Sequence, residues 1–118
     1  MKVKRNYKIF INDIWDSINK IEEFVLGICY EDFLKDDKTV SAVVRKLEII
    51  GEDTKNIPAS IRQKYSNVNW KGMAGMRDKL IHDYSGADTE ILWKVIKKDI
   101  VEVKPKIKSI LKDINAEK

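Results

Sequence analysis

Apolar residues recur along the first quarter of the chain at intervals of four and three, the spacing of one face of an α-helix. We therefore predict an amphipathic helix over residues 6–26, followed by a break at Gly27. The apolar stripe consists of Tyr7, Ile11, Ile14, Ile18, Ile21, Val25 and Ile28. Its near-heptad spacing leaves open whether the stripe faces the core of its own chain or a second subunit.

Residues that favour helix N-termini divide the rest of the chain. They predict helices over residues 37–55, 58–65 and 70–82 and a long final helix, opened by Asp37, Pro58, Asn69 and Asp88 respectively. The final helix has an apolar stripe of Ile91, Leu92, Val95, Ile96, Ile100, Val103, Ile107, Ile110 and Leu111. Pro105 is expected to kink this helix, because proline removes an amide donor and crowds the preceding turn.

No segment alternates with period two for long enough to predict a strand. The expected fold class is therefore all-α, an up-and-down bundle of four to five helices. Its 118 residues predict a single helical domain over residues 1–118. The linker at residues 65–69 is the likeliest mobile connection on composition.

Composition limits the environment and the partners. No apolar run is long enough to span a membrane, and the charged start of the chain lacks the apolar core of a signal peptide. The single cysteine, Cys29, excludes an intramolecular disulfide and suits a reducing cytoplasm. We expect Cys29 to be a small buried apolar residue.

The formal net charge of +4 permits nucleic-acid binding without requiring it. Lysines are concentrated near the C-terminus, at Lys94, Lys97, Lys98, Lys104, Lys106, Lys108 and Lys112. The plainer interpretation of this set is a solvated outer helix face. The alternative is an electrostatic approach surface for RNA.

Residues 77–84 read Arg-Asp-Lys-Leu-Ile-His-Asp-Tyr and contain the only histidine of the chain. The guanidinium of Arg77 can hold two phosphate oxygens, and the imidazole of His82 can transfer a proton at physiological pH. This pair suits the cleavage of a phosphodiester. Taken alone, the motif is more simply a solvated helix end at which His82 offsets the C-terminal partial charge.

Landmarks along most of the chain favour the chemical interpretation. From Lys4 to about Leu111 the sequence resembles the HepT-like toxins of the HEPN superfamily, small helical ribonucleases of prokaryotic toxin–antitoxin pairs. The landmarks are Asp-Phe-Leu-Lys-Asp at 32–36, Arg-Lys-Leu-Glu-Ile-Ile-Gly-Glu at 45–52, and Trp-Lys-Gly-Met-Ala-Gly-Met at 70–76. Residues 77–84 follow directly and keep the family's Arg-x4-His-x-Tyr spacing. Asp78 stands where many members have asparagine, at a position where the pattern asks only for a polar residue.

The resemblance implies the toxin of a type VII toxin–antitoxin system, a metal-independent endoribonuclease in which the ribose 2′-hydroxyl attacks the neighbouring phosphorus. His82 would act as general base or acid, and Arg77 would stabilise charge on the phosphoryl oxygens. Asp78 would support catalysis by orienting the imidazole. Its competing role is a salt bridge with Lys71 or Lys79.

Regulation and partners are implied in the same way. Tyr84 would accept AMP from a cognate minimal nucleotidyltransferase antitoxin, and this modification would silence the enzyme. The plainer role of Tyr84 is to pack its ring on the last helix. RNA, the antitoxin and a second copy of the chain are the expected partners. The alternative function is a non-catalytic helical dimerisation module that binds a nucleotidyltransferase.

Metal catalysis is not expected, and no cofactor is implied. One histidine and one cysteine give no recognisable zinc-binding set. The carboxylates are scattered over different helix faces, without the clustering that a two-metal nuclease requires.

Helix geometry raises a question about the motif. At about 100° per residue, Arg77 and His82 lie roughly 140° apart around an ideal helix, too far apart to share one phosphate easily. Either the helix loosens before His82, or two copies assemble the site across a two-fold axis. The resemblance implies the second, a homodimer with both motifs in one cleft. Gly72 and Gly75 would then admit another backbone or an RNA strand, or they serve packing within the chain.

Overall fold

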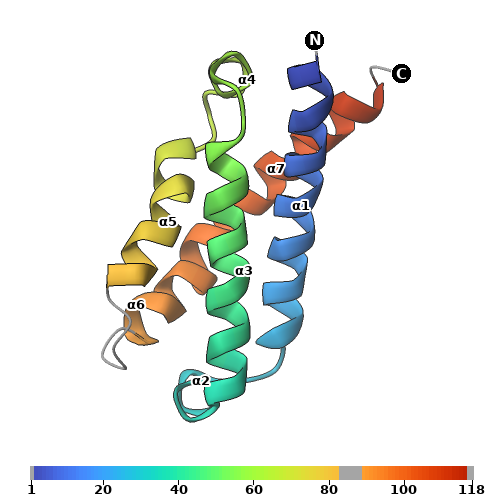
Figure 1. The fold of residues 1–118 in the computed structure, drawn as a ribbon. Coiled ribbons are helices and arrows are strands. Elements are labelled where there is room, and N and C mark those ends of the chain that lie inside the picture. Colours follow the sequence, from blue (N-terminus) through green and yellow to red (C-terminus); the bar gives the residue numbers. More distant parts are fainter. Residues whose placement is uncertain (1, 83–88, 117–118) are drawn as a thin grey trace.

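The computed structural model describes residues 2–82 and 89–116, and it describes side chains for residues 7–76 and 89–116. All regular elements within these ranges are helices, which confirms the all-α class (Figure 1). In chain order they are α1 (Lys2–Phe24), α2 (Tyr30–Lys35), α3 (Asp37–Lys55), α4 (Ala59–Lys64), α5 (Trp70–His82), α6 (Thr89–Lys94), the π-helical turn η2 (Val95–Asp99) and α7 (Ile100–Ala116). None of these helices is long and apolar enough to cross a membrane.

Helix α3 is the centre of the bundle. It packs against α1 on one side and α5 on the other, and α7 packs on α1 from behind (Figure 1). The α1 stripe is buried in this chain's own core, where Ile11, Ile14, Ile18 and Ile21 have no exposed surface. Of the two alternatives for this stripe, the structure shows the first: it faces the core of its own chain and is not available to a second subunit.

The elements α6, η2 and α7 follow one another without interruption, and we call them the C-terminal run. At η2 the Ile100 amide donates to the Val95 carbonyl five residues back, which is the π-helical pattern. Pro105 lies inside α7, which continues as a helix on both sides of it. The predicted final stripe is buried at most positions, but Ile91 remains 37% exposed.

Two predicted helix starts need adjustment by one residue. Asp36, and not Asp37, caps α3, because its carboxylate accepts hydrogen bonds from the Thr39 amide at 3.1 Å and the Thr39 hydroxyl at 2.6 Å. These bonds lower the pKa of Asp36 from its ordinary value. Similarly, Pro58 precedes the first residue of α4 instead of occupying it.

The region after α1 holds what the sequence analysis missed. Gly27 has a φ of 76°, a conformation that glycine adopts readily, and it confirms the predicted break. The short helix α2 then makes six helices, counting the C-terminal run once, where four to five were expected. Cys29 precedes α2 and is exposed, so the prediction of a buried cysteine was wrong. Phe33 of α2 is the buried residue instead, with its ring centroid 5.0 Å from that of Trp93.

A buried carboxyl group lies between α1 and α3. Asp53 is 7% exposed, and its Oδ2 has no hydrogen-bond partner among the described residues. Burial, and to a lesser extent the negative charges of Asp13 and Glu52, raises the pKa of Asp53 to about 7. In the unfolded chain the group ionises near its ordinary pKa of 3.8. Between these two values the folded chain holds the extra proton, so folding stability falls as the pH rises through this interval.

We therefore expect Asp53→Asn to raise the free energy of unfolding at about pH 8 by about 1–3 kcal/mol, the usual penalty for an unsatisfied buried polar group. The gain should be smaller at about pH 5, where wild-type Asp53 is mostly protonated in the folded chain. Urea unfolding at both pH values measures the difference. Asp16→Asn, at an exposed position of α1, is the control. A gain that does not change with pH would contradict the assigned titration of Asp53.

Candidate functional site

Helix α5 carries most of the predicted motif. Its range, Trp70–His82, includes the backbone of Arg77, Asp78 and His82, whose side chains are outside the described part of the structure. Tyr84 lies outside the described residues altogether. The backbone is α-helical through His82, so a loosening of the helix before this residue, the first of the two alternatives for the motif, is not observed.

The start of α5 is fixed by side-chain hydrogen bonds. Asn69 caps the helix as predicted, accepting the Gly72 amide at 3.0 Å. The buried Trp70 donates its indole N–H to the carbonyl oxygens of Arg62 and Tyr65, at 3.2 and 3.0 Å. These bonds tie the end of α4 to the first turn of the motif helix.

The linker from α4 to α5, predicted to be the likeliest mobile connection, is joined to α7 by two contacts. The Tyr65 hydroxyl donates to the Asp113 carboxylate at 2.9 Å, and the Lys106 ammonium donates to the Asn67 carbonyl at 2.9 Å. Val68 adds a buried side chain to the core. The base of α5 is therefore held by residues far along the chain.

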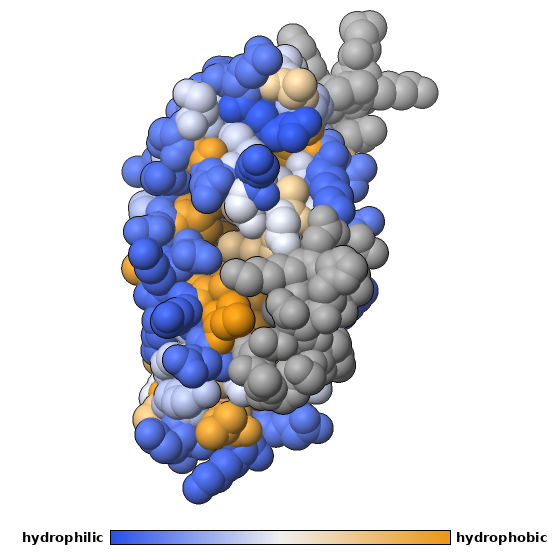
Figure 2. Space-filling model, turned by 90° about the vertical axis from the view of Figure 1, so that its left-hand side faces the viewer, coloured by the Kyte–Doolittle hydropathy of each residue, from blue (hydrophilic) through white to orange (hydrophobic). Residues whose placement is uncertain are grey.

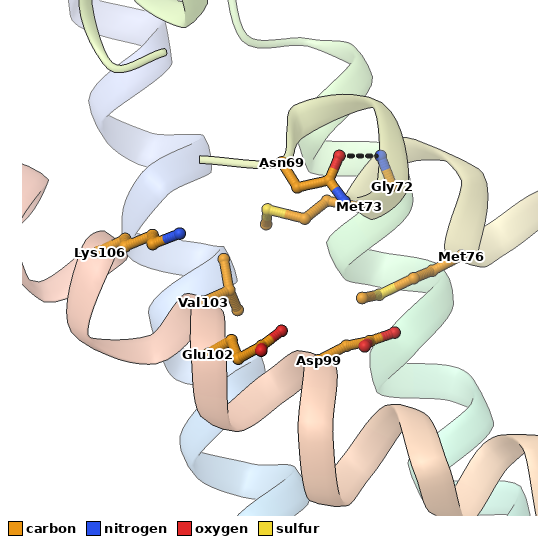
Figure 3. Close-up of a pocket in the computed structure, with 8 residues that line it drawn as sticks. All are labelled: Asn69, Gly72, Met73, Met76, Asp99, Glu102, Val103 and Lys106. Carbon is orange, nitrogen blue, oxygen red and sulfur yellow. Dashed lines mark hydrogen bonds between the residues drawn. The ribbon is translucent and has the colours of Figure 1, made fainter. Parts of the chain in front are cut away.

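On one side, α5 faces the C-terminal run across a cavity of about 120 Å³ (Figure 3). The carboxylates of Asp99 and Glu102 line this cavity together with Met73, Met76, Val103, Lys106, Asn69 and Gly72. A neighbouring cavity of about 300 Å³ is mainly apolar, lined by Leu47, Gly72, Gly75, Met76, Ile91, Val95 and Asp99. Figure 2 looks onto this side of the molecule and shows hydrophobic residues gathered in a hollow.

On its other side, α5 forms an open groove with α4. We call this the α4–α5 groove; it has a volume of about 900 Å³ and is lined by Ala59, Arg62, Gln63, Ser66, Val68, Asn69, Trp70, Lys71, Ala74 and Gly75. Its two charged residues, Arg62 and Lys71, are both cations. The sequence analysis did not single out Arg62, because nothing in the spacing shows that α4 lies beside α5.

The two glycines of α5 differ in their surroundings. A Cβ on Gly72 would lie 2.5 Å from the Asn69 side-chain nitrogen, so packing within the chain explains that glycine. Among the described residues outside its own helix, no atom lies within 4 Å of a Cβ built on Gly75. Packing within this part of the chain therefore does not explain Gly75, which borders both the α4–α5 groove and the apolar cavity.

The lysines of the C-terminal run fit a solvated face with local contacts. Lys97 lies over the Trp93 ring, with its nitrogen 4.8 Å from the ring centroid. Lys104 pairs with Glu22 of α1, and Lys106 bonds the linker as described. Lys94, Lys98, Lys108 and Lys112 are exposed. Several of the lysines therefore join parts of the fold, and the alternative of an approach surface for RNA stays a prediction.

The described residues contain no group of three or more histidine, cysteine, aspartate or glutamate side chains placed to hold a metal ion. The carboxylates of Asp99 and Glu102 form part of the wall of the 120 Å³ cavity beside α5, together with Lys106.

Comparisons with known proteins extend these observations. Residues 14–110 match the family of HepT-like ribonucleases. The chain is 49% identical over 110 residues to the "Probable ribonuclease HepT" of Thermococcus cleftensis, covering 93% of this chain and 100% of the relative. It is 47% identical over 111 residues to a candidate RNase of Caldanaerobacter subterraneus, covering 94% of this chain and 96% of the relative. A candidate RNase of Methanocaldococcus jannaschii is 42% identical over 114 residues, with 97% and 94% covered.

No solved structure matches the chain significantly. The family match nevertheless spans most of the helical bundle and includes the whole of α5. Relatives of nearly the same length align over almost the entire chain. On this evidence the chain belongs to the HepT-like ribonuclease family.

Proposed function

We propose that this chain is the toxin of a type VII toxin–antitoxin system and cleaves RNA without a metal ion, using Arg77 and His82. The observation that carries the proposal is the family match across residues 14–110, which includes both residues at the family's spacing. The continuous helix α5 supports it by giving the motif one rigid backbone. The cytoplasm, where such a target RNA is found, is the proposed location.

The proposed reaction needs only groups that the motif supplies. His82 takes the proton of a ribose 2′-hydroxyl, and the 2′-oxygen forms a bond to the adjacent phosphorus. The bond from phosphorus to the 5′-oxygen breaks, and that oxygen leaves with a proton from a general acid. Arg77 stabilises the charge on the phosphoryl oxygens. The products are a 2′,3′-cyclic phosphate and a 5′-hydroxyl, and DNA is not cleaved because it lacks the nucleophile.

Asp78 is proposed to orient the imidazole of His82. It precedes His82 by four residues on the same helix, the spacing at which residues are neighbours on a helix surface. A carboxylate that accepts one ring N–H fixes which nitrogen is free to move the catalytic proton.

The test is a cleavage assay on single-stranded RNA in the presence of EDTA. The proposal expects cleavage to persist, with 2′,3′-cyclic phosphate ends on the products and no cleavage of DNA of the same sequence. Protein that is folded but inactive on all RNAs would instead favour the alternative, a non-catalytic module that binds a nucleotidyltransferase.

We propose further that the active site forms in a homodimer. Because α5 stays helical through His82, roughly 140° of rotation separates this residue from Arg77 on an ideal helix. A second copy related by a two-fold axis would bring the arginine of one motif near the histidine of the other.

Light scattering is therefore expected to show a dimer at protein concentrations of about 10–100 µM, a range that detects even modest association energies. Measuring at low and high salt separates a packed interface from weak charge attraction. A monomer under both conditions would contradict the shared site.

We propose that Tyr84 is the site of regulation. It follows His82 by two residues, so an AMP group on its hydroxyl would place a phosphate near the catalytic pair. That phosphate would compete for the Arg77 guanidinium and repel RNA phosphates. The proposed donor enzyme is a minimal nucleotidyltransferase antitoxin that uses ATP.

A further inference from the structure

The two sides of α5 differ in charge. Among the residues whose side chains are described, the cavity toward the C-terminal run is lined by two carboxylates, Asp99 and Glu102, and by Lys106, which bonds the Asn67 carbonyl. The charged residues described at the α4–α5 groove are two cations, Arg62 and Lys71. A polyanion is therefore attracted to the α4 side of the motif helix and repelled from the other side.

Arg62 is placed to receive an anion. Its backbone carbonyl is fixed by the Trp70 indole N–H at 3.2 Å. The Nε of its guanidinium is shielded from solvent and has no hydrogen-bond partner in the described structure. The side chain of Arg62 is half-buried and lines the groove. Its charge is therefore partly desolvated, and an anion bound in the groove would offset that charge.

The floor of the groove is open at Gly75. A glycine inside a helix is about 1 kcal/mol less favourable than alanine, and no atom within 4 Å of its Cβ position requires this one. Its neighbour Ala74 is also small. The helix backbone can therefore be approached closely here by something that is not part of this chain.

The groove points along α5 toward the motif. Lys71 and Gly75 are four residues apart on α5; Asp78 follows Gly75 after three residues, and His82 follows Asp78 after four. Steps of three and four keep to one line along an α-helix. A strand that follows this line from the groove reaches the motif.

We propose that the α4–α5 groove binds the single-stranded RNA that flanks the scissile phosphate, with Arg62 and Lys71 each holding a backbone phosphate. Gln63 and Ser66, both exposed at the groove, supply neutral hydrogen-bonding groups for the ribose hydroxyls. This inference rests on the proposed ribonuclease function and adds a binding track to it. The two cations described at the groove favour RNA over a second copy of this chain, whose net charge is +4.

Binding can be tested apart from cleavage by working in a His82→Ala background. Fluorescence anisotropy measures the affinity for a labelled single-stranded RNA across a range of salt concentrations. Each phosphate contact contributes about 0.7 to the slope of log affinity against log salt for single strands. Arg62→Gln with Lys71→Gln should therefore lower the slope by about 1.4.

The matched control is Lys35→Gln with Lys38→Gln, which removes the same charge from exposed positions. These lysines lie on α2 and α3, at the end of the bundle opposite α4 (Figure 1). The control pair should leave the slope near that of the parent protein. A second, uncharged test is Gly75→Leu, whose Cβ meets no described atom outside its own helix within 4 Å; this variant should weaken RNA binding with the slope retained.

Cleavage assays then separate this inference from the proposed function. With His82 restored, the groove variants should lose cleavage of long RNA but keep that of a dinucleotide, which has no flanking phosphate. If the slope of the Arg62/Lys71 variant equals that of the control, the inference is overturned, whether or not the parent cleaves RNA. If light scattering shows instead that the variant loses its dimer with an unchanged slope, the groove is a subunit interface and the inference is also overturned.

Discussion

Replacing His82 with alanine is expected to abolish RNA cleavage and the toxicity of the expressed protein, and Arg77→Ala should do the same. The loss of a general acid or base costs about 10²–10⁴ in rate, and the loss of a preorganised charge-stabilising group costs about 10²–10³. Initial rates on a labelled RNA, compared with growth on induction, measure the two effects. In a shared site, the two variants mixed together should recover part of the activity, because some mixed dimers carry one intact set.

Stability must be checked alongside activity. Helix periodicity puts Met73, Met76 and Leu80 on one apolar stripe of α5, with Arg77 at its edge. Neither Arg77 nor His82 lies at the centre of that stripe, so each change should alter the free energy of unfolding by only about 0.5 kcal/mol. Lys108→Ala, an exposed change on α7, is the control and should retain activity and toxicity. Circular dichroism that shows an unfolded variant would reassign that residue to a structural role. Full activity in a folded His82→Ala protein would exclude the proposed mechanism.

Tyr84→Phe should release the toxin from control by its antitoxin. Phenylalanine keeps the ring but removes the hydroxyl oxygen that attacks the α-phosphate of ATP. After incubation with the cognate nucleotidyltransferase and Mg-ATP, intact-mass spectrometry should show an AMP adduct on the wild type and none on the variant. In cells, the variant should remain toxic when the antitoxin is present.

Tyr65→Phe is the matched control, since Tyr65 is the tyrosine of the linker and its hydroxyl bonds Asp113. That variant should still be modified at Tyr84. An adduct that persists on Tyr84→Phe would place the acceptor elsewhere, and Tyr65 or Ser85 would be the first residues to examine. Loss of cleavage in unmodified Tyr84→Phe would mean that the hydroxyl also contacts RNA.

Periodicity was sufficient to predict the core of the bundle. The predicted stripe of α1 is buried at its four isoleucines from Ile11 to Ile21, while Ile28, beyond the end of α1, is partly buried; most of the predicted stripe in the C-terminal run is buried too. Such stripes follow from helix geometry alone, which is why a single sequence reveals them. The helix α2 was missed because six residues contain too few turns to show a period. Asp36 and Asp37 could not be separated as caps because both residue types accept the same hydrogen bond.

The residues of the candidate site that lie on one helix were predictable from the sequence, but the residues that a neighbouring helix contributes were not. Spacing placed Arg77 and His82 on one helix, and the structure shows that helix. The second cation of the groove, Arg62, was not predictable, because it belongs to α4. The hydrogen bond from the Trp70 indole to the Arg62 backbone carbonyl holds the end of α4 beside α5. Nor does composition show that Gly75 faces open space while Gly72 is needed beside Asn69. Both facts depend on how neighbouring helices pack.

The two bonds between the α4–α5 linker and α7 have a consequence for synthesis on the ribosome. Tyr65 is translated 48 residues before its partner Asp113, and Asn67 is translated 39 residues before Lys106. Chains emerge from the N-terminal end first. A nascent chain therefore contains the whole proposed catalytic motif before it contains Lys106 or Asp113, the α7 partners of these two bonds. The isoleucines of α7 that complete the core against α1 also come late. A ribosome that carries this message therefore holds an unfinished enzyme until the last helix has been made.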